Sequence, residues 1–354
     1  MTTNSFDLTK IAIKTFVPQE TSREVWEQYH QLNEELILEL HPEDPLPNQD
    51  VVEKEICYDS PDYIITRWLV YKDETEKELI GYCTFNYCKE TSVIYEENKE
   101  IGLVHIMIAN KYRRQGLGTK LLKMIIPNLE RVGCKYLSVA TKYPSGWNFC
   151  EKQGAKLANI MKESRLNLQK VDWPLVETWI KEGESRNPNV KLESFYGVSE
   201  VNIEKYAELL TELISEAPTL EEDTERTIEI INPERFRAYV QFLSEKTEKL
   251  FTIRSVEPDG QISGLTEIHF SDVNTPDLLD QGLTGVKTDF RGTGLGKWLK
   301  ATLLLYIKEN LPNARFLITG NAEHNAPMLS INIRLGFKPY RQRRSYKFTI
   351  DKLV

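Results

Sequence analysis

Two short segments of the sequence combine arginine with closely spaced glycines, a composition suited to holding an anion. Arg113–Gly118 reads Arg-Arg-Gln-Gly-Leu-Gly, and Arg291–Gly296 reads Arg-Gly-Thr-Gly-Leu-Gly. Each follows an apolar stretch and precedes a helical pattern, which predicts a turn between a strand and a helix N-terminus. Unpaired N–H groups there attract anions, and glycine lets the backbone approach them closely. Both segments therefore predict a phosphate or diphosphate site.

Two common phosphate-binding motifs do not fit these segments. A P-loop requires Gly-x4-Gly-Lys-Ser/Thr, but Arg291 occupies the first glycine position and Trp298 follows Lys297. A dinucleotide fingerprint requires a third glycine where Lys297 stands. The sequence therefore supports neither an NTPase nor a Rossmann dehydrogenase. A single glycine-rich turn can be a mere tight connection, but its recurrence with matching flanks favours a binding role.

The two segments belong to a longer internal repeat. Arg113 and Arg291 are 178 residues apart, and Gly154 and Gly336, which each end a second helical pattern, are 182 apart. Both spacings are close to half of the 354-residue chain. Two copies of one domain are therefore expected.

Hydrophobic periodicity places similar elements in both copies. The first copy is predicted to contain strands at 11–16, 63–71, 79–87, 101–108, 136–140 and 157–168, with helices at 22–40, 116–132 and 145–153. The second is predicted to contain strands at 190–196, 250–256, 264–270, 282–288, 315–319 and 340–350, with helices at 203–215, 233–244, 294–309 and 325–335. Residues 181–189 are polar and contain Gly183 and Pro188, so we expect domains at 1–170 and 190–354 joined by a linker at 171–189. Asp172 could cap a short helix through Trp179 within that linker.

Composition excludes several classes of protein. A formal net charge of −8 argues against a nucleic-acid partner. No apolar stretch approaches the ~20 residues of a membrane span, and the N-terminus has no secretory pattern. Five cysteines without a CxxC and scattered histidines give no disulfide framework and no metal site. We expect a cytoplasmic protein with no membrane partner.

The pattern Arg-x-x-Gly-x-Gly, present twice, resembles the signature loop of the GNAT acetyltransferase superfamily, which binds the pyrophosphate of acetyl-CoA. In the second half, Glu-Ala-Pro-Thr-Leu (216–220), the segment 291–300 and the segment 319–337 resemble tandem GNAT proteins related to mycothiol synthase. The resemblance implies an α/β (α+β) fold. It consists of two tandem GNAT-like acyl-CoA N-acyltransferase domains, with mixed, mostly antiparallel sheets flanked by helices. It also implies acetyl-CoA as co-substrate.

The resemblance transfers cofactor-binding roles to both loops and to the strands before them. In that family, the strand position five residues before the first arginine lends backbone groups to the pantetheine arm and the thioester. Asn325 would cap the last helix in any fold, and in the family an asparagine there also contacts pantetheine. The predicted cofactor-binding residues are Ile108, Arg113, Arg114, Gln115, Gly116, Leu117, Gly118, Gly285, Val286, Arg291, Gly292, Thr293, Gly294, Leu295, Gly296 and Asn325.

Acyl transfer to an amine needs a proton acceptor, an oxyanion donor and an acid for the leaving thiolate. The backbone N–H of Val286 is the expected oxyanion donor. In the family, a carboxylate on the strand ahead of the cofactor strand commonly acts as the base, and the resemblance therefore implies this role for Glu267. His269 is the alternative, although a solvated strand face would show the same alternation. In the family, a tyrosine four residues before the glycine of the last helix often protonates the departing thiolate. At that position this sequence has Asn332 in the second copy and Cys150 in the first. Asn332 could instead bond the thioester sulfur or the substrate, or be an ordinary helix-face amide.

Acidic residues follow the first helix of the second copy. Glu221, Glu222 and Asp223 would concentrate a cationic amine beside the site, although such a run is also typical of a solvated loop. His269 and His324 are further predicted substrate-binding residues, and a loop histidine such as His324 is equally typical of a merely exposed position.

These observations predict direct transfer of acetyl from acetyl-CoA to a small primary amine, with the chemistry in the C-terminal domain. That half contains no cysteine, which excludes a cysteine-based covalent route there. The N-terminal domain is predicted to be a non-catalytic half of a monomeric pseudo-dimer or of a homodimer subunit. Its aromatic residues Tyr143, Trp147 and Phe149 are predicted to be core or interface. The alternatives are a non-catalytic acyl-CoA sensor and a transferase for a different acyl group.

Overall fold

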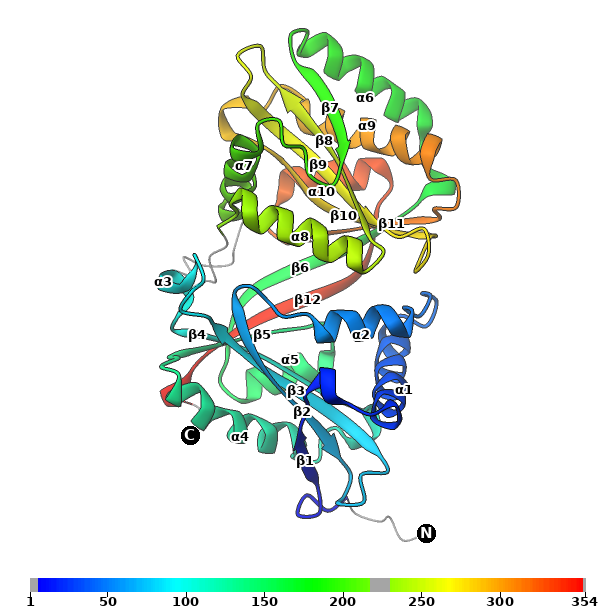
Figure 1. Cartoon of the computed structure of the whole chain (residues 1–354). Helices are drawn as coiled ribbons and strands as arrows, with labels where there is room; N and C mark the ends of the chain where they lie inside the picture. Colours follow the sequence, from blue (N-terminus) through cyan, green and yellow to red (C-terminus); the bar gives the residue numbers. More distant parts are fainter. Residues whose placement is uncertain (1–5, 217–229, 353–354) are drawn as a thin grey trace. The chain divides into compact units, whose positions relative to one another are not determined.

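The computed structural model describes residues 6–216 and 230–352, which divide into two compact units. Residues 6–160 and 343–352 form the N-terminal unit, and residues 161–216 and 230–342 form the C-terminal unit. Each unit is a sheet with helices on both faces (Figure 1). Within the described ranges, no helix is both long and apolar enough to cross a membrane.

The N-terminal unit repeats the predicted order of strands and helices, with two additions. Its sheet has the order β1-β2-β3-β4-β5-β12, antiparallel except for the parallel pair β4–β5. The strands are β1 (Ala12–Thr15), β2 (Tyr63–Tyr71), β3 (Leu79–Cys88), β4 (Ile101–Ile108), β5 (Tyr136–Thr141) and β12 (Lys338–Thr349). The helices are α1 (Arg23–Leu40), α2 (Gln49–Cys57), α3 (Tyr95–Asn98), α4 (Leu117–Arg131) and α5 (Pro144–Lys152), of which α2 and α3 were not predicted.

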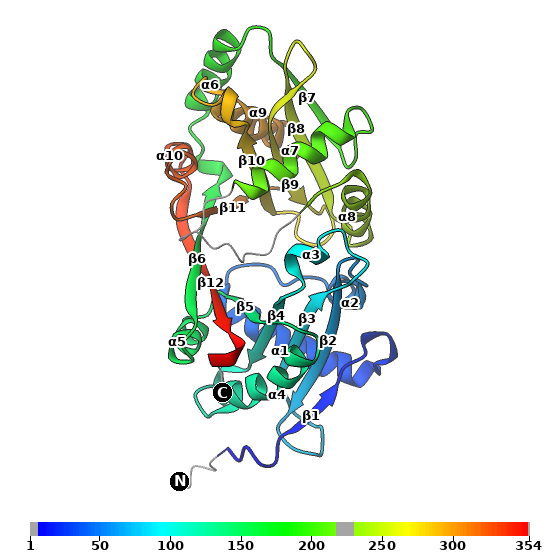
Figure 2. The same ribbon diagram turned by 90° about the vertical axis from the view of Figure 1, so that its left-hand side faces the viewer.

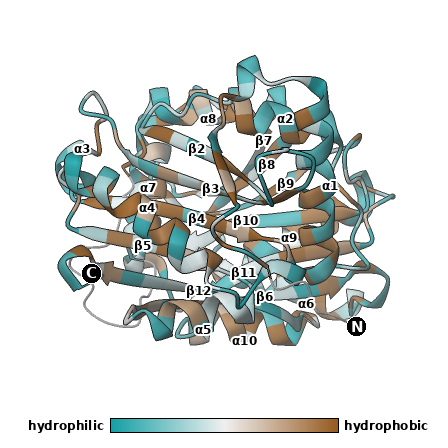
Figure 3. Cartoon of the chain, turned by 90° about the horizontal axis from the view of Figure 1, so that it is seen from below, coloured by the Kyte–Doolittle hydropathy of each residue, from teal (hydrophilic) through white to brown (hydrophobic). Residues whose placement is uncertain are grey.

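The two faces of this sheet carry different helices, as Figure 2 shows. On one face, Phe85 and Gly102 pack against Leu129 of α4. On the other, the ring of Tyr82 lies 5.2 Å from that of Tyr29 of α1. Because side chains alternate along a strand, β3 and β4 contribute every second residue to each helix layer. Helix α4 carries both hydrophobic and hydrophilic segments, as its colouring in Figure 3 shows, and its buried residues follow helical spacing on one face.

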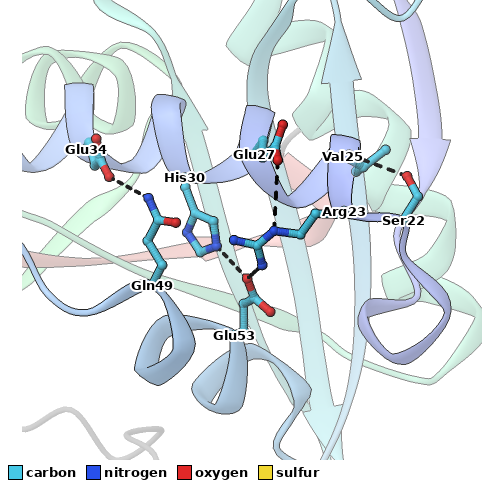
Figure 4. A network of polar contacts seen from close by, with 8 residues as sticks. All are labelled: Ser22, Arg23, Val25, Glu27, His30, Glu34, Gln49 and Glu53. Carbon is cyan, nitrogen blue, oxygen red and sulfur yellow. Dashed lines mark hydrogen bonds and ion pairs between the residues drawn. The ribbon is translucent and has the colours of Figure 1, made fainter.

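A polar network attaches α2 to α1 (Figure 4). The carboxylate of Glu53 lies 2.7 Å from Arg23 and 2.8 Å from the buried ring of His30, both on α1. Gln49 donates to Glu34 at 3.0 Å. Only Val51 and Val52 of α2 are buried, so this helix lacks the long apolar periodicity that would have predicted it.

The C-terminal unit repeats the same succession. Its sheet has the order β6-β11-β10-β9-β8-β7, and only β10–β11 is parallel. The strands are β6 (Lys156–Asn167), β7 (Lys191–Tyr196), β8 (Lys249–Val256), β9 (Ile262–Phe270), β10 (Leu278–Val286) and β11 (Phe316–Ala322). The helices are α6 (Trp173–Arg186), α7 (Ile203–Ser215), α8 (Pro233–Glu245), α9 (Leu295–Asn310) and α10 (Ala326–Leu335). Short 3₁₀ turns occupy Pro18–Glu20, Asn110–Tyr112, Leu168–Lys170, Thr288–Phe290 and Ile350–Lys352.

The last strand of each copy differs from the prediction. The strand after α5 was predicted to complete the first copy. In the structure, residues 161–167 of this strand, β6, pair with β11 and belong to the C-terminal unit. Reciprocally, residues 344–349 of β12 pair with β5 in the N-terminal unit. The structure therefore replaces the expected domains at 1–170 and 190–354 by units that exchange their closing strands. Equivalent sheet edges accept equivalent strands, so local pattern does not reveal which copy a strand joins.

The predicted linker at 171–189 is largely helical. Asp172 caps α6 by accepting from the N–H of Leu175 at 3.1 Å, which confirms the predicted cap, but the helix continues beyond Trp179 to Arg186. Val176, Trp179 and Gly183 are buried, and a Cβ added at Gly183 would lie 2.3 Å from Trp298 of α9. The polar residues that suggested a linker form the outer face of a packed helix.

Candidate coenzyme-binding site

The central parallel strands separate in both units. In the N-terminal unit, the pairing of β4 with β5 runs from Ile101–Tyr136 to Leu103–Ser138, and β4 then continues unpaired on that side to Ile108. In the C-terminal unit, the pairing of β10 with β11 runs from Leu278–Phe316 to Gln281–Thr319. Each described pair thus opens a gap toward the carboxyl ends of its strands, next to the glycine loop. Ligands commonly bind outside that end of a parallel pair.

Backbone N–H groups face each gap. Ala109 donates its N–H to the carbonyl of Ile80 at 2.9 Å, and Lys287 donates to Ser263 at 2.9 Å. Successive N–H groups of a strand point to opposite sides, so the N–H of the preceding residue points away from the antiparallel neighbour. That preceding residue is Ile108 in β4 and Val286 in β10. This geometry supports the oxyanion role predicted for Val286 and gives Ile108 the equivalent position in the N-terminal unit.

A cavity of about 760 Å³ lies in the N-terminal unit at this gap. Gly118 and Leu122 line it from α4, whereas Thr84 and Asn86 line it from the opposite face of β3. The cavity therefore passes between the separated strands from one face of the sheet to the other. Tyr143 and Phe149, predicted to be core or interface, also line it, as do Arg343 and Phe348 at the end of the chain.

The lining of this cavity suits an anion. Its charged side chains are Arg113, Arg114, Lys142, Lys152 and Arg343, and none of the described residues that line it is Asp or Glu. Such a lining raises the local concentration of a negatively charged ligand even though the whole chain is acidic. The cavity is thus a locally basic pocket in an acidic protein.

Both glycine loops have the same backbone conformation. Gly116 and Gly294, at the N-caps of α4 and α9, have φ of 87° and 90°. Two residues earlier, Arg114 has φ of 61° where Gly292 has 82°. These left-handed values are costly for a residue with a Cβ, so Arg114 retains a strained backbone in a loop that lines the cavity.

The first arginine of each loop holds the strand before it. Arg113 donates Nε–H to the carbonyl of Ile108 at 2.7 Å, and its two terminal nitrogens reach Glu39 at 2.6 and 2.7 Å. Arg291 likewise donates to Val286 at 2.8 Å and pairs with Glu216. Both guanidinium groups are therefore occupied by protein partners, and their evident role is to position the loop.

The remaining predicted cofactor-binding residues make hydrogen bonds within the protein or pack in its interior. Gln115 donates to the carbonyl of Lys111 at 2.9 Å, and Thr293 donates to that of Phe290 at 3.1 Å. Leu117 and Leu295 are buried in the two cores. A Cβ at Gly285 would lie 2.7 Å from Leu213 of α7, and one at Gly296 would lie 3.7 Å from Val286. Asn325 accepts from the N–H of Met328 at 3.2 Å, which confirms that it caps α10.

Polar groups that the sequence analysis missed line the cavity opposite the loop. His105 of β4 is paired in register with Thr84 of β3. His105 lines the cavity, and desolvation by the surrounding protein lowers its pKa, which favours the neutral ring. The Oδ1 atom of Asn86 is buried and has no hydrogen-bond partner among the described residues. The signal for Asn86 was the polar or amphipathic side chain at every second residue of β3, at Tyr82, Thr84 and Asn86, and His105 follows from its pairing with Thr84.

Glu267 lies in a different environment, within the C-terminal unit. The pairing register of β10 shifts between Gln281 and Thr284, so two residues of β10 face Glu267 of β9. The N–H of Leu283 and the hydroxyl of Tyr206 donate to its carboxyl group. Glu267 is only 6% exposed, and burial raises its pKa to about 7, against the opposing effect of these hydrogen bonds. The alternative of a solvated strand face is therefore wrong.

The structure does not bring all predicted substrate residues together. His269 lies on the same face of β9 as Glu267, where burial and then the charge of Lys246 lower its pKa to about 4. His324 is exposed between β11 and α10. Glu221, Glu222 and Asp223 lie outside the described residues.

Asn332 is buried and bonded to protein groups on both sides. Its amide nitrogen donates to Oδ1 of Asn321 at 2.6 Å, and its Oδ1 accepts from Nζ of Lys300 at 2.6 Å. Lys300 is 2% exposed, and burial lowers its pKa to about 7. The sequence analysis did not single out this lysine.

Among the described residues, no group of three or more His, Cys, Asp or Glu side chains could hold a metal ion.

Two repeated units, each with separated parallel strands and a glycine loop at a helix N-terminus, define a tandem fold of one repeated α/β domain. Residues 11–155 match the model of the Acetyltransferase (GNAT) family, so the N-terminal half carries a GNAT domain. GNAT proteins are acyltransferases that generally use acyl-CoA as donor. The chain thus has the predicted tandem GNAT architecture, whereas the nearer resemblance to mycothiol synthase remains a prediction.

Solved structures support this fold over nearly the whole chain. A tandem GNAT protein from the clavulanic acid biosynthesis pathway is 18% identical with a TM-score of 0.71, covering 96% of this chain and 99% of its own. A GCN5-related N-acetyltransferase from Sphaerobacter thermophilus is 14% identical with a TM-score of 0.64, covering 96% of both chains. A fungal glucosamine N-acetyltransferase region is 13% identical with a TM-score of 0.62, covering 96% of this chain and 38% of the other. Comparison with curated proteins gives no significant match.

Proposed function

We propose that this chain transfers an acetyl group from acetyl-CoA to a small primary amine, by direct attack of the amine on the thioester. The observation that carries the proposal is the cavity of the N-terminal unit. It passes through the sheet between β4 and β5, with a helix N-terminus suited to an anion on one face and the unpaired Oδ1 of Asn86 on the other.

The residues of this cavity fit a coenzyme A thioester. Its volume of about 760 Å³ lies within the usual range for ligand pockets. The backbone around Gly116 and the side chain of Arg114 would hold the diphosphate. The N–H of Ile108 would donate to the thioester carbonyl oxygen, where negative charge develops.

The opposite face of the cavity supplies what the acceptor needs. The amine nitrogen forms a bond to the carbonyl carbon, the carbon–sulfur bond breaks, and coenzyme A leaves as the thiolate. His105, held neutral by its surroundings, would accept the proton that the amine loses. The free Oδ1 of Asn86 would accept an N–H of the acceptor. His105 and Oδ1 of Asn86 both accept a hydrogen from the incoming group. An amine nitrogen carries enough hydrogens to serve both, whereas a hydroxyl carries only one, so the site favours an amine acceptor.

This proposal places the chemistry in the other half of the chain from the sequence-based expectation. The C-terminal unit remains the second candidate because a carboxyl with a pKa near 7, such as that of Glu267, is suited to a general base. Its low exposure and its bonds to Tyr206 and Leu283 favour a structural role.

Release of free thiol from acetyl-CoA in the presence of a panel of small amines tests the function. We expect turnover that falls at least tenfold in His105→Gln and remains near wild type in Glu267→Gln. The reverse pattern would assign the chemistry to the C-terminal unit. Coenzyme binding without turnover on any amine would favour an acyl-CoA sensor, and turnover only with longer thioesters would favour a different acyl group.

A further inference from the structure

The repeat lets each residue of the C-terminal gap be compared with its counterpart in the N-terminal unit. Arg113 and Arg291 begin equivalent loops, so Leu122 of α4 corresponds to Lys300 of α9. Cys150 and Asn332 both stand four residues before the glycine that follows α5 and α10. The paired registers of β4–β5 and β10–β11 begin at Tyr136 and Phe316, which makes Thr141 correspond to Asn321.

All three N-terminal counterparts line the cavity. Leu122, Cys150 and Thr141 belong to its wall on the side of α4 and α5. They are small or apolar and leave room between the helix and the separated strands. The corresponding space in the C-terminal unit lies between α9, α10 and β11.

The C-terminal unit fills this space with its own side chains. Lys300 extends from α9 to Oδ1 of Asn332 on α10, and Asn332 continues the chain of hydrogen bonds to Asn321 on β11. The ammonium nitrogen of Lys300 also lies 5.3 Å from the ring centre of Phe337 and 3.8 Å from the sulfur of Met328. A coenzyme arm entering here would have to displace these groups and leave buried polar atoms without partners, which is costly.

We propose that Lys300, together with Asn332 and Asn321, closes the coenzyme cleft of the C-terminal unit from within, so that one chain binds one coenzyme A, in the N-terminal unit. The inference rests on the proposed function for the presence of coenzyme A. The inference goes beyond the proposed function because it assigns different roles to the two copies. The glycine loop at 291–296 then serves the fold of the C-terminal unit rather than a second coenzyme.

Titration calorimetry with coenzyme A on the full chain measures the number of sites. We expect one site in the wild type and two in Lys300→Leu/Asn332→Cys, which introduces the N-terminal counterparts of two of the three residues and leaves Asn321 in place. Leu122→Lys should abolish the original site. Lys308→Leu, an exposed position on the same helix α9, is the matched control and should retain one site. Thermal unfolding of each variant verifies that it is folded.

The outcomes separate this inference from the function on which it rests. Two sites in the wild type, or one site in a folded Lys300→Leu/Asn332→Cys variant, would overturn the closure while leaving coenzyme binding intact. Loss of the wild-type site in Gly294→Val together with its survival in Leu122→Lys would also overturn it, because the occupied unit would then be the C-terminal one. No heat with coenzyme A in any of these proteins would defeat both proposals.

Discussion

Nε of Arg113 donates to the carbonyl oxygen of Ile108 across 2.7 Å, joining the start of the glycine loop to the end of β4. Arg291 and Val286 repeat the bond at 2.8 Å. The same guanidinium groups pair with Glu39 at the end of α1 and with Glu216 at the end of α7. One arginine therefore joins the loop, the strand before it and a helix of its unit, which gives the arginine of both loops a structural role.

Arg113→Lys should weaken coenzyme A binding about tenfold, roughly 1.4 kcal/mol, with little change in the fold. Lysine retains the charge but not the planar fork that serves Ile108 and Glu39 together. Calorimetry on Arg113→Lys, Glu39→Gln and the double variant measures the coupling between the two side chains. Strictly additive effects would show that the pair does not position the loop.

Arg114→Gly should stabilise the protein while weakening coenzyme binding. The change relieves a left-handed backbone at φ of 61° and should raise the free energy of unfolding by about 0.5–1 kcal/mol. It also removes a cation from the cavity wall. Urea unfolding and coenzyme titration measure the two effects.

The reciprocal change Gly292→Arg is the matched control for Arg114→Gly. It places arginine at φ of 82° in the C-terminal loop and should destabilise by a similar amount without altering coenzyme affinity. Equal losses of affinity in both variants would contradict the assignment of the coenzyme to the N-terminal loop.

Local sequence signals predicted much of the fold because they act over short distances. The repeat of arginine and glycine located both loops, and the caps at Asp172 and Asn325 form as expected. The partners of β6 and β12 were missed because the choice between two equivalent sheet edges depends on long-range pairing. Helix α2 was missed because its attachment depends on Glu53, His30 and Arg23 rather than on an apolar face.

The candidate site was harder to predict than the fold. Glu267 was singled out from its place before the cofactor strand, but only burial and the register shift opposite it define its chemistry. Asn86 and His105 are unremarkable in the sequence and gain importance from the cavity that they share. Lys300 is an ordinary helical lysine until the fold buries it against Asn332.

Glu267→Gln should remove an acid-side pH dependence of stability. The pKa of this carboxyl is about 7 in the folded chain and near 4.5 in the unfolded one. Between these values the unfolded chain loses the proton first, so wild-type stability falls as pH rises from 4.5 to 7, by about 3 kcal/mol. Glutamine keeps an acceptor for Tyr206 and has no proton to lose. Urea unfolding at pH 5, 6, 7 and 8 should show the difference between variant and wild type growing up to pH 7; a constant difference would contradict the raised pKa.

Lys300→Met should remove a pH dependence of opposite sign. The pKa of Lys300 is about 7 in the folded chain, below its ordinary 10.5. From pH 7 to 10.5 the unfolded chain holds a proton that the folded chain lacks, so wild-type stability rises with pH across that window. The slope contributed by one proton approaches 1.4 kcal/mol per pH unit and should disappear in the variant. Unfolding at pH 7.5, 8.5 and 9.5 measures it, and a slope unchanged from wild type would show that Lys300 titrates normally.

Ending the chain after Gln342 should destroy the N-terminal unit although no residue before that point is altered. Residues 344–349 of β12 pair with β5, and Tyr346 and Arg344 bond Glu151 of α5 at 2.8 and 3.2 Å. Their loss opens the edge of β5 and removes Arg343 and Phe348 from the cavity wall. We expect aggregation or early unfolding of the truncated chain, and no coenzyme binding. A chain ending after Ile350, which keeps the paired strand, is the matched control and should bind coenzyme A normally. Wild-type binding and unfolding in the shorter chain would show that β12 does not complete this unit.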